Sequence, residues 1–131
     1  VSRGFSRSID AQPLLVCDMP FLTYQCGENK AVEYAGRIIK NTYAKAVKVE
    51  GADPEVQNVI SRLIRMGIPV MGHLGLTPQS LNIIGGWKLQ GKSEDAANQI
   101  LSDAKLLESV GIFSLVLEMV PKNWQRKSLM I

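Results

Sequence analysis

The strongest constraint on the fold of this chain is a regular alternation of short apolar runs with amphipathic segments. The apolar runs lie at 14–17, 46–49, 69–72 and 113–117. Between them, apolar residues recur at helical spacing in 29–41, 53–67 and 93–111. Continuously apolar runs are typical of strands buried on both faces of a parallel sheet covered by helices. The order βαβαβαβ predicts an α/β fold, either a doubly wound sheet or half of a (β/α)8 barrel.

Two of the helical segments carry explicit start and stop signals. Asp53 followed by Pro54 is typical of an N-cap and a first helical residue, and Gly67 follows the segment as a C-terminal glycine would. Ser93 and Gly111 bound the last helical segment in the same way. A closed eight-stranded barrel needs roughly 200 residues. The 131 residues here correspond to one domain, or to about half of such a barrel.

Composition excludes several classes of protein. No run of about 18 apolar residues occurs, so no membrane-spanning helix is expected. The net charge of +3 is dispersed, without a basic stripe interleaved with aromatic residues, which argues against a nucleic-acid partner. Cys17 and Cys26 match neither a metal-binding nor a disulfide pattern, so we expect a reducing compartment, the cytoplasm. Because the chain starts at Val1, we expect it to be processed or excised from a longer one.

A polar residue ends each apolar run. Asp18, Glu50, His73 and Glu118 occupy these positions, and Lys48 lies two residues before Glu50. The carboxyl ends of parallel strands lie on one side of a sheet, so these residues are expected to converge. Taken singly, an acidic residue directly after a strand is often a helix cap or a surface charge. A single histidine in that position is often only a hydrogen-bonded loop residue. Together, the carboxylates predict a divalent cation site suited to Mg²⁺.

This combination suits chemistry on an α-keto acid. A metal that binds the carboxylate and keto oxygen can stabilise an enolate, while a carboxylate removes the proton from the adjacent carbon. The connection at 72–92 is unusually long and is therefore active-site candidate material. Within it, 85–92 lacks the phosphate-loop patterns and is interpreted as a mobile lid or turn.

Several strings resemble the ketopantoate hydroxymethyltransferase (3-methyl-2-oxobutanoate hydroxymethyltransferase) family. They are VCDMPF at 16–21, AVKVEG at 46–51, PVMGHLGLTPQS at 69–80, GGWKLQGK at 85–92 and LVLEMVP at 115–121. The resemblance runs in order through the chain to Pro121. It implies a (β/α)8 TIM barrel, Mg²⁺, and transfer of a hydroxymethyl group from 5,10-methylenetetrahydrofolate to 3-methyl-2-oxobutanoate. The product is 2-dehydropantoate, for pantothenate biosynthesis.

The resemblance also implies a role for each polar residue. Asp18 would ligate the metal and contact substrate, and Glu50 would belong to the metal site. Lys48 and His73 would bind substrate, and Glu118 would be the proton acceptor. The keto acid and the folate would be the small-molecule partners.

The match corresponds to the central four strands of the family's barrel. The DSLG-type segment that supplies another metal ligand, and the GIGAG-type strand, have no counterpart here. We therefore expect 1–131 to be a single partial barrel with an atypical tail at 122–131, active only within a complete barrel that is a homo-oligomer. Two alternatives remain open: a non-catalytic α/β assembly module, and a related metal-dependent enzyme that makes or breaks carbon–carbon bonds in keto acids.

Overall fold

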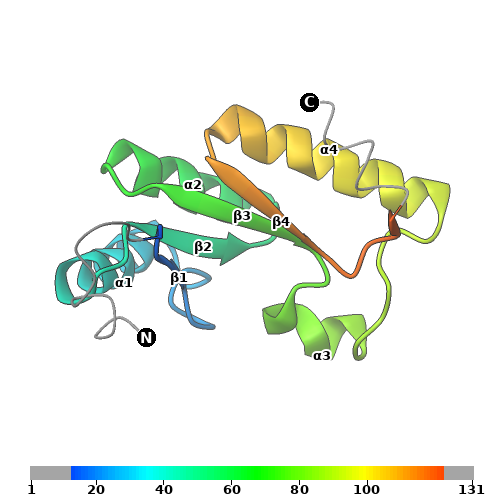
Figure 1. Cartoon of the computed structure of the whole chain (residues 1–131), viewed down its shortest axis with the longest axis horizontal. Coiled ribbons are helices and arrows are strands. Elements are labelled where there is room, and N and C mark those ends of the chain that lie inside the picture. Colours follow the sequence, from blue (N-terminus) through cyan, green and yellow to red (C-terminus); the bar gives the residue numbers. More distant parts are fainter. Residues whose placement is uncertain (1–12, 123–131) are drawn as a thin grey trace.

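A computed structural model of the chain describes residues 13–122, which form a mixed α/β fold (Figure 1). The elements in chain order are β1 (Val16–Asp18), α1 (Glu28–Asn41), β2 (Ala46–Glu50), α2 (Pro54–Arg65), β3 (Val70–Gly75), the 3-10 helix η2 (Pro78–Ser80), α3 (Leu81–Ile84), α4 (Glu94–Val110) and β4 (Ser114–Glu118). The four strands form one parallel sheet in the order β1-β2-β3-β4. The predicted α/β class is confirmed. Of the predicted tail at 122–131, only residue 122 is among the described residues.

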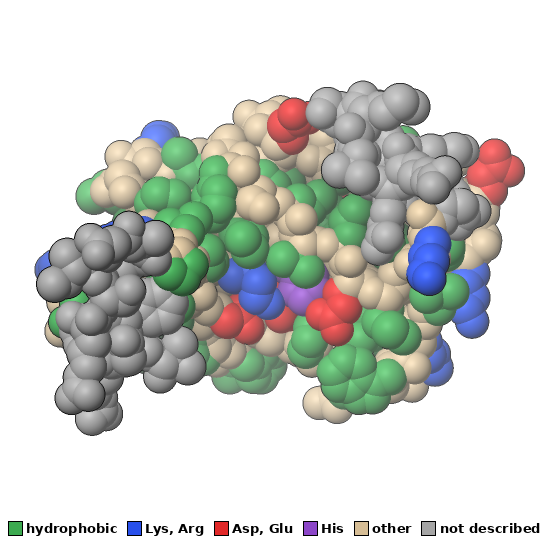
Figure 2. Space-filling view, in the orientation of Figure 1, with side chains coloured by type: hydrophobic (Ala, Val, Ile, Leu, Met, Phe, Trp, Pro, Cys, Tyr) green, Lys and Arg blue, Asp and Glu red, His purple; other side chains and the backbone are tan. Residues whose placement is uncertain are grey.

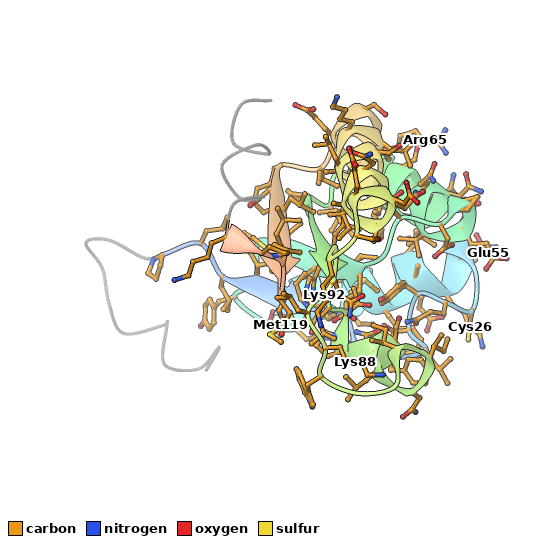
Figure 3. The ribbon with its side chains drawn as sticks, turned by 90° about the vertical axis from the view of Figure 1, so that its right-hand side faces the viewer. Cys26, Glu55, Arg65, Lys88, Lys92 and Met119 are labelled. Carbon is orange, nitrogen blue, oxygen red and sulfur yellow. The ribbon has the colours of Figure 1, made fainter. Side chains whose placement is uncertain are left out.

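The long helices α1, α2 and α4 form one layer against one face of the sheet. Figure 1 shows them behind the strands, and in Figure 3 the same helices lie to the right of the strands, with Glu55 of α2 near the right-hand edge. The opposite face carries no long helix from residues 13–122. Within these residues, no helix is long and apolar enough to cross a membrane.

Local signals explain where α2 and α4 begin and end. The Asp53 side chain accepts hydrogen bonds from the backbone N–H groups of Glu55 and Val56 at 3.0 and 3.1 Å, an N-cap interaction typically worth about 1 kcal/mol. Ser93 caps α4 in the same way, accepting from the Ala96 N–H at 3.2 Å. The helix ends at Gly111 in a left-handed conformation with φ of 105°. The predicted starts of both helices are confirmed.

The core lies between the helix layer and the sheet. Its fully buried members come mainly from β2, α2, β3 and α4: Val47, Val49, Ile60, Leu63, Val70 and Leu107. The expectation that all four strands are buried on both faces is wrong for β1 and β4, which are only partly buried. These two strands form the edges of the described sheet, whereas β2 and β3 have a neighbour on each side.

The strand that contains His73 is longer than predicted. The sequence predicts that it ends at His73, but β3 continues to Gly75, so His73 lies inside the strand. Gly75 pairs with Glu118 and has φ of 86°, and a Cβ atom added there would collide with the Glu118 carbonyl oxygen. Only glycine permits this close approach of β3 to the end of β4. The extension therefore follows from a contact between strands and not from the apolar run.

The connection at 72–92 is also more ordered than predicted. After β3 it contains η2 and α3, and the segments without regular secondary structure before α4 begins are 76–77 and 85–93. The Gln90 N–H donates to the Met119 carbonyl at 2.8 Å, which places this segment against the end of β4. That 85–92 is a mobile lid stays a prediction.

Candidate active site

Strand register places five polar side chains on one face of the sheet. Asp18 pairs with Lys48, and Glu50 pairs with His73. Glu118 pairs with Gly75, two residues beyond His73. Paired residues in a parallel sheet point to the same side, as do residues two apart along a strand. Asp18, Lys48, Glu50, His73 and Glu118 therefore share a face, here called the polar cluster, which Figure 2 shows at the centre of the molecule.

Lys48 contacts three of the other four residues of the polar cluster. Its ammonium Nζ lies 3.0 Å from Asp18 Oδ1, 3.2 Å from Glu50 Oε1 and 3.0 Å from His73 Nδ1. The Lys48 side chain is 17% exposed and that of Glu50 only 3%, whereas that of Asp18 is 53% exposed. A carboxylate as buried as Glu50 needs a charged partner and hydrogen bonds. Lys48 supplies that charge, and Asp18 forms the solvent-facing side of the cluster.

Glu50 is held by residues from two neighbouring loops. Its Oε2 accepts a hydrogen bond from the Gln79 backbone N–H at 3.0 Å. The Tyr24 hydroxyl accepts from the Glu50 N–H at 3.2 Å and donates to the Glu50 carbonyl at 3.4 Å. Burial raises the pKa of the Tyr24 hydroxyl, so it stays protonated and keeps both bonds. Both the carboxylate and the backbone of Glu50 are thus held in place by hydrogen bonds.

His73 joins Lys48 to Glu118. Because the Lys48 ammonium can only donate, His73 Nδ1 accepts and the ring hydrogen is assigned to Nε2. His73 Nε2 lies 3.2 Å from Glu118 Oε2 without meeting hydrogen-bond geometry, and it has no hydrogen-bond partner among residues 13–122. Buried polar atoms are normally paired. A ligand oxygen that took the place of the Glu118 carboxylate beside His73 Nε2 would satisfy this atom.

We expect the free energy of unfolding to fall as the pH drops below about 6.5, the pKa of an unperturbed histidine. Burial lowers the pKa of His73 and the Lys48 ammonium lowers it further, so the folded chain resists protonation while the unfolded chain accepts the proton. The contribution of His73 to the free energy of unfolding is therefore fully present above pH 6.5. It is lost as the pH falls from 6.5 toward the pKa of His73 in the folded chain, with a slope of at most about 1.4 kcal/mol per pH unit.

Urea unfolding at several pH values between 5 and 7.5 measures this slope. His73 is the only histidine in the sequence, so His73→Gln should remove the histidine contribution, and the difference between the two proteins isolates it. Gln can accept from Lys48 and donate toward Glu118, which preserves the contacts. Equal slopes in the two proteins would show that His73 does not titrate differently in the folded and unfolded chains.

The carboxylates of the polar cluster fit a Mg²⁺ site that is completed by other groups. Mg²⁺ takes one or two carboxylates and keeps several waters or substrate oxygens. Asp18 is half exposed and able to bind directly, whereas both Glu50 oxygens already accept hydrogen bonds. Within residues 13–122, no group of three or more His, Cys, Asp or Glu side chains could hold a metal by itself. The Asp18 carboxylate is thus suited to bind Mg²⁺ directly, and the Glu50 carboxylate is suited to contact it through a water molecule.

Segment 85–92 borders the polar cluster at β4. Figure 3 shows Lys88 and Lys92 in the same region as Met119, in agreement with the hydrogen bond from Gln90 to Met119. Trp87 in this segment is 65% exposed, and Met119 directly follows Glu118. The segment offers an aromatic surface and positive charge near the end of β4.

The structure brings together all five residues that the sequence predicts, but two supporting residues were missed. Tyr24 and Gln79 contact Glu50, and neither was assigned a role from the sequence. Gln79 lies within the 69–80 string, which was a usable signal. Tyr24 stands in the loop after β1, and nothing in its spacing indicates that it is buried. Cys17 is half-buried, and burial raises the pKa of its thiol.

Comparison with known proteins gives consistent matches. The family model for ketopantoate hydroxymethyltransferase matches residues 1–127. An enzyme of Prochlorococcus marinus subsp. pastoris (strain CCMP1986 / NIES-2087 / MED4), named 3-methyl-2-oxobutanoate hydroxymethyltransferase, is 75% identical over 123 residues, which cover 93% of this chain and 47% of the relative. Proteins of the same name from strains MIT 9515 and MIT 9312 are 72% and 69% identical over the same coverage. The chain spans about half the length of these curated relatives.

Proposed function

The chain belongs to the ketopantoate hydroxymethyltransferase family, and we propose that it supplies the polar cluster of an enzyme that hydroxymethylates 3-methyl-2-oxobutanoate. The proposed donor is 5,10-methylenetetrahydrofolate and the proposed product is 2-dehydropantoate. The observation that carries the proposal is the polar cluster itself, in which an ammonium, a buried histidine and an exposed carboxylate face one space.

We infer that the described strands are four consecutive units of a (β/α)8 barrel and that 1–131 is a single partial domain. Each strand pairs with the next in sequence, and α1, α2 and α4 share one face. A doubly wound sheet reverses its strand order at a switch point and carries helices on both faces. Neither feature occurs within residues 13–122, which supports the barrel.

The keto acid would bind between Lys48 and Asp18. The Lys48 ammonium is the group able to pair with the substrate carboxylate, and Asp18 gives it an exposed counter-charge that the substrate can replace. His73 Nε2, which lacks a hydrogen-bond partner among the described residues, would donate to a substrate oxygen. These contacts would orient the branched carbon of the keto acid toward Glu118.

Mg²⁺ would be held by Asp18 directly and by Glu50 through water, with further ligands from groups beyond the described residues. When bound, Mg²⁺ acts as a Lewis acid that stabilises negative charge on the keto oxygen. Because the Lys48 ammonium lies against both carboxylates, it has to move aside for the cation or keep contact with only one of them.

Glu118 is the proposed base. Its carboxylate would take the proton from the branched carbon, and that carbon would then bond to the methylene carbon of the folate donor. The carbon–nitrogen bonds of the donor would break, water would supply the hydroxyl oxygen, and tetrahydrofolate would leave. The Glu118 side chain is 37% exposed and so is open to substrate, whereas Glu50 is enclosed. Lys88 and Lys92 lie in the same region as Met119 (Figure 3) and would face the donor, together with the exposed Trp87 of the same segment.

The complete enzyme is proposed to be a cytoplasmic homo-oligomer. The two cysteines, Cys17 and Cys26, are both free, which agrees with a reducing compartment. The proposal of a homo-oligomer rests on the family resemblance alone.

The test is product formation by a protein of full family length that contains this sequence. We expect 2-dehydropantoate only when the folate donor, the keto acid and Mg²⁺ are all present. A carbon–carbon bond cleaved without the donor would favour a keto-acid lyase. Neither product nor stabilisation by Mg²⁺ and keto acid would favour a non-catalytic module.

Asp18→Asn is expected to weaken Mg²⁺ binding and, through the loss of the cation, to raise the KM for the keto acid at least tenfold, because an amide is a poorer Mg²⁺ ligand than a carboxylate. Asp103→Asn makes the same charge change on α4, where Asp103 accepts from Gln99. Calorimetric Mg²⁺ titration and steady-state kinetics measure both variants. An Asp18→Asn protein that matches the control would remove Asp18 from the metal site.

A further inference from the structure

Gln79 connects the loop after β1, the segment after β3 and the end of β2 at the polar cluster. Its side-chain Nε2 donates to the Met19 carbonyl at 2.8 Å, in the loop after β1. Its Oε1 accepts from Gln25 Nε2 at 2.9 Å, in the same loop. Its backbone N–H, in the loop after β3, donates to Glu50 Oε2 at the end of β2 at 3.0 Å. One residue therefore contacts the loop that follows Asp18 and the carboxylate of Glu50.

The Met19 contact bears directly on Asp18. Met19 is fully buried, and its N–H donates to the Lys48 carbonyl at 3.0 Å. With its own carbonyl bound by Gln79, the backbone of Met19 is held on both sides. Asp18 is the preceding residue, half exposed at the end of an edge strand of only three residues. Its position therefore depends on how firmly Met19 is held.

We propose that Gln79 is a positioning residue that sets the distance between the Asp18 and Glu50 carboxylates. Gln79 would act through Met19 on Asp18 and through its N–H on Glu50, and it would itself contact neither substrate nor metal. The expected effect on Mg²⁺ binding rests on the proposed function. The expected effect on the two loops that Gln79 joins does not.

The variant Gln79→Met separates these contacts. It keeps the length of the side chain and the backbone N–H, but loses the bonds to Met19 and Gln25. Gln57→Met is the matched control, because Gln57 Nε2 makes an equivalent bond to the Ala52 carbonyl at 2.7 Å without contacting the polar cluster. Loss of a partner that orients a metal ligand typically costs roughly 10- to 100-fold in affinity or activity.

Both variants are made in the protein of full family length. Hydrogen exchange, followed by mass spectrometry on peptides that cover 15–22 and 76–82, is expected to be at least tenfold faster in Gln79→Met and unchanged in Gln57→Met. Mg²⁺ affinity is expected to fall at least tenfold in Gln79→Met, with a melting temperature close to that of the control. If Gln79→Met does not fold, Gln79→Glu, which retains only the acceptor toward Gln25, replaces it.

Unchanged exchange in both peptides would overturn the proposal, whatever the protein catalyses. Faster exchange with unchanged Mg²⁺ affinity would also overturn it, because Gln79 would then stabilise the two loops without positioning the Asp18 and Glu50 carboxylates. Failure of the parent protein to form 2-dehydropantoate would count against the proposed function, while the exchange experiment still decides whether Gln79 holds the two loops.

Discussion

Glu118→Gln is expected to reduce kcat by about 10²- to 10⁴-fold, the usual contribution of a positioned base. The amide has the same size as the carboxylate but cannot accept a proton from carbon. Because the Glu118 side chain is 37% exposed and its one close ionisable neighbour among the described residues is the neutral His73, little stability should be lost. The KM for the keto acid should change much less than kcat, since Lys48 and Asp18 would still bind it.

Steady-state kinetics with the folate donor, in the protein of full family length, measure this effect. Glu108→Gln is the control, because Glu108 is an exposed carboxylate on α4, outside the polar cluster. Loss of exchange between solvent and the hydrogen on the branched carbon of the keto acid should accompany the loss of turnover. A variant that retains turnover within twofold of the control would exclude Glu118 as the base.

Lys48→Met is expected to lower the free energy of unfolding by about 3–5 kcal/mol, the typical result of removing one partner from a buried ion pair. Met matches the lysine stem in size, so the core should lose little packing. Glu50 would keep the Gln79 bond but have no positive charge to balance it in a buried position. The double variant Lys48→Met/Glu50→Gln should recover most of the loss, because the uncompensated charge is then absent.

Chemical denaturation of the single and double variants measures these effects. Lys45→Met is the matched control: Lys45 is exposed just before β2, and its substitution should change stability by no more than about 0.5 kcal/mol. If Lys48→Met is as stable as Lys45→Met, Lys48 does not neutralise Glu50. If the double variant is no more stable than Lys48→Met, the loss comes from packing and not from charge.

Much of the local structure could be predicted from the sequence because short-range chemistry determines it. The caps at Asp53 and Ser93 act on N–H groups two or three residues away, so they can be recognised without knowledge of the fold. The apolar runs located all four strands. The extension of β3 through His73 to Gly75 could not be predicted, because it depends on pairing with β4, more than 40 residues later.

The candidate site was predicted as a set of residues but not as an arrangement. Strand ends on one side of a parallel sheet make Asp18, Glu50 and Glu118 converge in any α/β fold of this order. That Lys48 is the central partner depends on register, which pairs it with Asp18 across the sheet. The strings shared with the family identify the residues of the site, but the distances between these residues and their burial depend on packing.

By itself, the sequence determined the class of fold, the order of its strands and long helices, the family and the five residues of the polar cluster. These follow from periodicity, from caps and from residue identity, all of which act locally along the chain. Only the tertiary structure decided that His73 is buried within a strand, that its Nε2 faces Glu118, and that Gln79 and Tyr24 hold Glu50. Such contacts join residues far apart in sequence, and no local pattern encodes the distances between them.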